Sequence, residues 1–237
     1  MSLVLGLNRG TPMTQTDQTS ACAKATAIHN AALHIAKNIS GGVAITRLML
    51  NEALAAAFGA TNVSGAWLQR DSFEMLEHAT VLSLLNLEIN NSTWSIDTIK
   101  AVSERLPTQT VRSEAQVSFQ QFSTPLDIAW FVGQTAAMSS DDLVLEPSAG
   151  TGLLALAGQL ARARLLLNEL DPLRHQLLAH SFPSATQFNC DGAQIDAQLA
   201  DNRPTVVLMN PPFLKRAGGS DDHFCGLSSP SSRTAYP

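Results

Sequence analysis

Residues 143–156, LVLEPSAGTGLLAL, predict a β-strand, a turn that contains Gly150 and Gly152, and the start of a helix. The glycines allow backbone N–H groups to approach a ligand closely at a helix N-terminus, and Ala155 completes a G-x-G-x-x-G/A spacing. Nucleotide sites of this kind place an acid about 20 residues further on, where it binds a ribose hydroxyl. Glu169, in LLLNELDP, occupies that place. The pattern predicts a nucleotide-type cofactor site, and by itself it still admits a nicotinamide cofactor.

The second half of the chain alternates short apolar runs with helix-compatible segments. The expected strands cover residues 143–145, 165–167, 187–190 and 206–209. This alternation is typical of βαβ units, so we predict an α/β fold with a parallel sheet over residues 124–213. Residues 214–237, with their glycines, serines and prolines, are expected to form an irregular tail.

The first half, residues 1–107, is expected to be a helical module. Two alanine-rich stretches, separated by Gly41 and Gly42, carry apolar residues three and four positions apart. The predicted apolar faces consist of Ile28, Ala32, Ile35 and Ile39 in the first stretch and of Leu50, Leu54, Ala57 and Phe58 in the second. A third helix is predicted over residues 66–88, and a fourth begins after the N-cap Ser95 and ends before Pro107. The polar segment 108–123 is expected to be a linker.

The segment VVLMNPPF, residues 206–213, indicates which kind of reaction the site could catalyse. A strand ends at Asn210, whose side-chain oxygen can accept a hydrogen bond from an amino group, and the Pro211 carbonyl offers a second acceptor. Pro212 restricts the turn, and Phe213 offers an aromatic face to a planar base. An exocyclic amine is a poor nucleophile because its lone pair is delocalised into the ring. Two acceptors that draw on its protons favour a pyramidal nitrogen and prepare it to attack a methyl group.

The segments EPSAGTG, NELDP and NPPF, in this order and spacing, resemble the S-adenosylmethionine-dependent N6-adenine DNA methyltransferases, including the methylase portions of mobile-element proteins that also carry a helicase. FSTPLDIAWFV, residues 122–132, resembles the family segment that touches the methionine end of the cofactor. The resemblance covers residues 119–213. It implies a Rossmann-like sheet with more strands than can be recognised here, so we expect a domain truncated after its fourth strand. It also implies DNA as substrate, a flipped-out target base, and fusion to or association with a helicase or target-recognition part.

The resemblance also implies roles for individual residues. At the target amine, it implies that Asn210 and Pro211 hold the amine, that Phe213 stacks on the base and that Pro212 shapes the turn. At the cofactor, it implies that the methionine part is lined by Glu146, Ser148, Gly150 and Gly152 and that the methionine end is closed by Thr124 and Pro125. It further implies that Glu169 binds the ribose and that Asp191 lies near the adenine. Plainer interpretations stay open. Thr124 and Pro125 are also an ordinary helix start, Glu169 is also a solvated acid at a strand end, and Asp191 is also a loop acid.

Composition limits the classes of function. The chain has 15 basic and 20 acidic residues and a formal net charge of −5, so attraction to nucleic acid would be confined to a local patch. The three cysteines form no CxxC pair and the six histidines no H-x-x-x-H pair, so we expect neither a disulfide framework nor a metal site. We expect a cytoplasmic protein without a secretory signal or membrane span.

The predicted function is S-adenosylmethionine-dependent methyl transfer to the N6 amine of adenine in DNA. Related NPP-type sites methylate a glutamine side chain in proteins or a base in RNA, so a protein-glutamine or RNA amine methyltransferase is the first alternative. A non-catalytic methyltransferase-like interaction protein is the second. A dehydrogenase comes last because it leaves NPPF unexplained.

Overall fold

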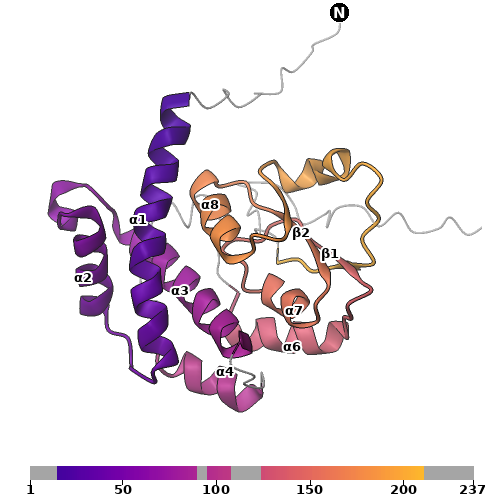
Figure 1. Cartoon of the computed structure of the whole chain (residues 1–237), viewed down its shortest axis with the longest axis horizontal. Helices are drawn as coiled ribbons and strands as arrows, with labels where there is room; N and C mark the ends of the chain where they lie inside the picture. The colour runs from indigo at the N-terminus through magenta and orange to yellow at the C-terminus, as the bar shows by residue number, and fades with distance from the viewer. Residues whose placement is uncertain (1–14, 90–94, 108–123, 211–237) are drawn as a thin grey trace, which may run out of the picture.

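The computed structural model describes residues 15–89, 95–107 and 124–210, and Figure 1 shows how they are arranged. The helical half consists of α1 (Gln15–Ser40), α2 (Arg47–Phe58), the 3-10 turn η1 (Asn62–Ser64), α3 (Gln69–Ile89) and α4 (Ile96–Ser103). Helix α1 packs against α2, α3 and α8, a helix of the second half, and α4 packs against α6, the first helix of that half.

The helix predictions for this half are confirmed. On α1 the predicted face is fully buried, and on α2 two of its residues are buried and two are partly buried. Ser95 caps α4, because the Thr98 N–H donates to its Oγ at 3.2 Å. Helix α2 is capped in the same way by Thr46 and ends at Gly59, which has φ +66°.

The second half contains a four-stranded sheet. Its strands are β1 (Leu143–Glu146), β2 (Arg164–Asn168), β3 (Thr186–Phe188) and β4 (Val206–Val207). All neighbouring strands are parallel, in the order β3-β2-β1-β4, so the predicted α/β fold with a parallel sheet is confirmed. Helix α6 (Leu126–Ala136) precedes β1, and the connections between strands contain α7 (Ala155–Leu160), α8 (Pro172–Ser181) and the 3-10 helix η2 (Gly192–Gln198).

The central strands β1 and β2 are buried on both faces, as is usual in a parallel sheet, whereas the outer strands β3 and β4 are partly exposed. One face contributes to a core cluster that also contains residues of α1, α3, α7 and α8; its strand residues include Val144, Leu165 and Leu167. The opposite face packs on η2 in a smaller cluster, which includes Leu143, Leu145, Leu166 and Ile195. Alternate residues of β1 thus face different cores. The helical half and the sheet share the larger core, so α3 and α8 are held directly against each other.

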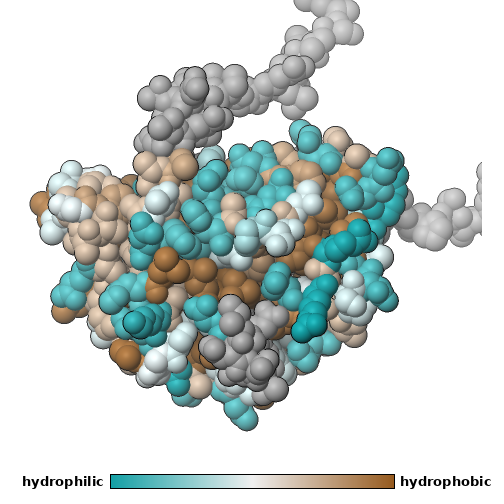
Figure 2. Space-filling view, in the orientation of Figure 1, coloured by the Kyte–Doolittle hydropathy of each residue, from teal (hydrophilic) through white to brown (hydrophobic). Residues whose placement is uncertain are grey.

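Hydrophilic residues cover much of the face shown in Figure 2, and a hydrophobic band crosses its middle. Within the described ranges, no helix combines the length and the apolar character needed to cross a bilayer.

Candidate cofactor and target site

The carboxyl ends of parallel strands lie at one edge of a sheet, and most of the predicted site residues lie at or after these ends. Thr124 and Pro125 are the exception, because they precede α6. The chain proceeds from β1 to β2 and β3 on one side, whereas β4 lies on the other side of β1. The strand order therefore reverses between β1 and β4. Open α/β sheets bind ligands at such a reversal, and the turn after β1 lies there.

The turn after β1 requires both of its glycines. Gly150 has φ +59° and Gly152 has φ +99°, which side chains of L-residues rarely adopt. A Cβ at Gly152 would lie 2.3 Å from Cε2 of Phe182, so the turn also packs closely on the C-terminal end of α8. The Gly150 N–H donates to Oε2 of Glu169 at 2.8 Å, and the Gly152 N–H donates to the Ala149 carbonyl at 2.9 Å. Both N–H groups are thus engaged inside the protein.

Glu169 follows β2 and holds this turn. The residue is only 7% exposed, so the interpretation as a solvated acid is wrong. Its Oε2 accepts from Gly150 N and its Oε1 from Asp171 N, each at 2.8 Å. Burial raises the pKa of Glu169, and the charge of Arg174 and these two hydrogen bonds act against that rise. Each carboxylate oxygen keeps a further lone pair for a hydroxyl ligand, and the ribose contact stays a prediction.

Glu146, the last residue of β1, carries one of two unsatisfied buried groups of the described site. It is 2% exposed, and its Oε2 has no hydrogen-bond partner in the described part of the chain. Burial raises the pKa of Glu146 well above its ordinary value, and the charge of Glu169 raises it further. The hydroxyl of Thr151, in the adjoining turn, is likewise buried with no partner among the described residues. Buried polar groups are normally hydrogen-bonded, so a cationic or hydrogen-bonding ligand fits this place.

Two segments that are 86 residues apart in sequence meet through Asn210 and Thr124. The Nδ2 of Asn210 donates to Oγ1 of Thr124 at 3.0 Å. The interpretation of this place as a helix start is confirmed, because α6 begins at Leu126 with Asp127 in its first turn. The N-cap is Pro125, however, and not Thr124, and it makes no side-chain capping hydrogen bond. Because Nδ2 is the engaged atom, Oδ1 of Asn210 is the atom that can accept from a ligand amine.

The loop after β3 lies against the turn after β1. A Cβ at Gly192 would lie 2.7 Å from the Pro147 carbonyl oxygen and 3.5 Å from Oγ of Ser148. The neighbouring Asp191 is exposed, and its Oδ1 accepts from the Ala193 N–H at 3.0 Å, which caps η2. Asp191 thus caps a helix, as an ordinary loop acid does. It also lies at the same edge of the sheet as Ser148, so a contact with the adenine of the cofactor stays a prediction.

Asn168, which the sequence patterns did not single out, joins these two loops. It is the last residue of β2 and is 1% exposed. Its Nδ2 donates to the carbonyls of Pro147 at 2.8 Å and Cys190 at 2.9 Å, and its Oδ1 accepts from the Cys190 N–H at 3.1 Å. The signal in the sequence was an amide directly after three leucines, since a buried amide needs several hydrogen-bond partners.

A buried ion-pair cluster, also missed from the sequence, connects α8 to α3. The Nε of Arg174 donates to Oε2 of Glu74 at 2.8 Å, and its Nη2 donates to Oε2 of Glu77 at 3.3 Å. The side chains of Arg174, Glu74 and Glu77 are 7%, 2% and 10% exposed. The two glutamates precede the arginine by 100 and 97 residues, so helical periodicity could not reveal the pairing.

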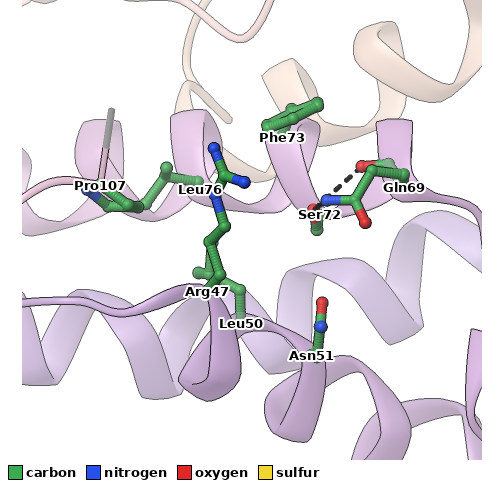
Figure 3. A pocket seen from close by; sticks show the side chains of 8 residues that line it. All are labelled: Arg47, Leu50, Asn51, Gln69, Ser72, Phe73, Leu76 and Pro107. Atoms are coloured by element: carbon green, nitrogen blue, oxygen red, sulfur yellow. Dashed lines mark hydrogen bonds between the residues drawn. The ribbon is translucent and has the colours of Figure 1, made fainter. Parts of the chain in front are cut away.

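Two cavities lie in the helical half, away from this site. One of about 10 Å³, between α2 and α3, has room for a single water molecule; Figure 3 shows its lining, which includes the hydrogen bond from Gln69 Nε2 to Ser72 Oγ. The other, of about 220 Å³, is lined by residues of α1, α3 and α4, with Arg105. Among the residues the structure describes, no group of three or more His, Cys, Asp or Glu side chains could hold a metal ion.

The structure thus brings Glu146, Ser148, Gly150, Gly152 and Glu169 together at the reversal. It joins Asn210 to Thr124. Pro211, Pro212 and Phe213, predicted at the target amine, lie outside the described residues, as do the linker 108–123 and the tail 214–237. No family model matches the chain, and neither does any curated protein or solved structure.

Proposed function

We propose that the chain is a Rossmann-like methyltransferase that binds S-adenosylmethionine and directs its methyl group to the N6 amine of adenine in DNA. The observation that carries this proposal is the hydrogen bond from Asn210 to Thr124. It joins the segment assigned to the target amine to the segment assigned to the methionine end of the cofactor. Methyl transfer needs donor and acceptor side by side, and this contact supports such an arrangement.

The buried acids of the site support a cationic cofactor. S-adenosylmethionine carries a sulfonium and an amino group and supplies an electrophilic methyl group, whose transfer leaves a neutral thioether and releases one proton from the methylated amine. Glu146, with its partnerless Oε2, fits the positively charged part. Glu169 fits the ribose hydroxyls, because its two oxygens still have accepting capacity.

At the acceptor side, Asn210 would bind the N6 amine through Oδ1 while Thr124 holds its Nδ2. This contact fixes the amide plane and therefore the direction in which Oδ1 accepts. The Pro211 carbonyl and the Phe213 ring keep the roles that the sequence predicts for them. A base in a duplex has to flip out of the stack to reach Asn210.

The substrate is identified by labelled methyl transfer from S-adenosylmethionine to duplex DNA, to RNA and to a glutamine-bearing protein. We expect label in adenine of the DNA. Label only in RNA or protein would replace DNA by one of the alternative substrates. Calorimetry on the same protein tests the cofactor, and a chain that fails to bind S-adenosylmethionine would contradict the proposal and favour the non-catalytic interaction protein.

Asn210→Ala tests the role of the amide, with Asn202→Ala as matched control. Asn202 lies in an exposed turn, where its Nδ2 donates to the Leu199 carbonyl at 2.9 Å. Removing a group that stabilises a reacting centre costs about 100-fold in rate, so Asn210→Ala should lower kcat by that factor. The affinity for S-adenosylmethionine should stay near that of the wild type, and Asn202→Ala should change neither quantity. If Asn210→Ala abolishes cofactor binding as well, its assignment to the amine is wrong.

A further inference from the structure

Arg174 is a buried cation that lies between the helical half and the turn after β1. We infer that Arg174 is a positioning residue, through which α3 holds the glycine turn and Glu169 in the arrangement that binds the cofactor. The inference rests on the proposed function for the identity of that cofactor. The positioning itself rests on contacts within this chain.

The first contact is between the guanidinium and the turn. A Cβ at Gly150 would lie 3.7 Å from Cζ and Nη1 of Arg174, so the guanidinium lies directly over this glycine. The Gly150 N–H donates to Glu169, whose pKa is raised by burial, and the charge of Arg174 is the largest influence in the opposite direction. Arg174 thus covers the turn and favours the ionised carboxylate to which the turn is bonded.

The second contact holds the arginine itself. Two different nitrogens of its planar group bind Glu74 and Glu77, both on α3. Because α3 belongs to the larger core, the position of the guanidinium is set by the helical half and not by the sheet alone. A lysine has one charged nitrogen at the end of a flexible stem, so it cannot bind Glu74 and also lie flat over Gly150.

A second ion pair, between Arg70 of α3 and Asp171, the N-cap of α8, reaches Glu169 by a different route. Arg70 and Asp171 are 3.4 Å apart, with side chains 26% and 16% exposed, and the Asp171 N–H donates to Oε1 of Glu169. The three atoms nearest to the Cβ position of Gly150, in contrast, all belong to Arg174. Partly exposed ion pairs contribute less to stability than buried pairs with charge-assisted hydrogen bonds. The experiment therefore perturbs the buried hydrogen bonds between Arg174 and α3.

The experiment uses the whole chain and compares Glu74→Gln and Arg174→Lys with the control Lys24→Met. Lys24 pairs with the buried carboxylate of Asp71 at 2.8 Å, so the control also breaks an ion pair of α3, at a place that does not touch the turn. Hydrogen exchange of the Gly150 amide is measured by NMR without cofactor, with the amide of Leu167 in β2 as reference for the core. The dissociation constant of S-adenosylmethionine is measured by calorimetry.

In both Arg174-cluster variants, Gly150 exchange should accelerate about tenfold while Leu167 exchange stays constant, since each variant removes a charge-assisted hydrogen bond. The dissociation constant should rise by about the same factor, and Lys24→Met should change neither quantity. Unchanged Gly150 exchange, or equal acceleration of Gly150 and Leu167, would overturn the inference, as would failure of both variants to fold. If wild type does not bind S-adenosylmethionine but Gly150 exchange accelerates selectively, the positioning role stands and the proposed function is wrong.

Discussion

Gly152→Ala tests whether the turn after β1 packs as tightly as the structure shows. An L-residue held at the left-handed φ of this turn, +99°, loses about 1–2 kcal/mol. The new Cβ would lie 2.3 Å from Cε2 of Phe182 and 3.0 Å from Cδ1 of Leu178. Relief of this overlap has to displace a ring that is 2% exposed, and such overpacking costs about 1–3 kcal/mol. We expect the free energy of unfolding to fall by about 2–5 kcal/mol in urea titrations followed by circular dichroism.

Gly59→Ala is the matched control for this substitution. Gly59 ends α2 with φ +66°, and no atom lies within 4 Å of its Cβ position. Alanine there incurs the backbone strain alone, about 1–2 kcal/mol. The difference between the two variants measures the contact with Phe182, so equal losses would refute the close packing of the turn.

Three further predictions concern other contacts. A Cβ at Gly133 of α6 would lie 2.4 Å from Cβ of Ala157, so Gly133→Ala should cost about 1–3 kcal/mol and Ala157→Gly should recover much of that loss; simple additivity in urea unfolding would contradict the contact. Burial, with the charges of His29 and His180, lowers the pKa of His78 to about 3. Below about pH 6.5, His78 is therefore protonated in the unfolded chain and still neutral in the folded chain. Stability should therefore fall as pH decreases, by roughly 3 kcal/mol at pH 4.5, and His78→Gln should lack that part of the loss in unfolding titrations at pH 7.5 and 4.5. The raised pKa of Glu146 means that stability falls as pH rises above about 4.5, so Glu146→Gln should have a higher Tm than wild type at pH 8 and weaker S-adenosylmethionine binding; a lower Tm would contradict the buried acid.

The sequence predicted those features that depend on local periodicity and on special backbone conformations. Ile28 and Ile35 recur at helical spacing and are buried on α1. The glycines after β1 both have positive φ, as a tight turn after a strand requires. These predictions succeed because the signal and its cause lie within a few residues of each other.

Features that depend on a partner far along the chain were missed or misjudged. Glu74 lies on the helix predicted over residues 66–88, and nothing in the spacing of that segment indicates that Glu74 is buried against Arg174 of another helix. The solvated interpretation of Glu169 fails for a related reason, since the turn that it binds precedes it by 19 residues. A hydrophobic pattern cannot show that a charged residue is buried when the group that neutralises it is distant in sequence.

The geometry of the same turn is our reason for proposing a sulfonium cofactor and not a nicotinamide dinucleotide. A dinucleotide site holds its pyrophosphate with free N–H groups of the glycine turn and with the helix that follows. Here the N–H groups of Gly150 and Gly152 donate inside the protein, and α7 begins only at Ala155. A pyrophosphate at this place would place negative charge beside two buried acids and raise their pKa values further, whereas a cation would favour the ionised form of both acids and so lower their raised pKa values. Calorimetry should therefore detect binding of S-adenosylmethionine and none of NAD, and the affinity for S-adenosylmethionine should increase with pH, because the ionised form of the two acids binds the cation better.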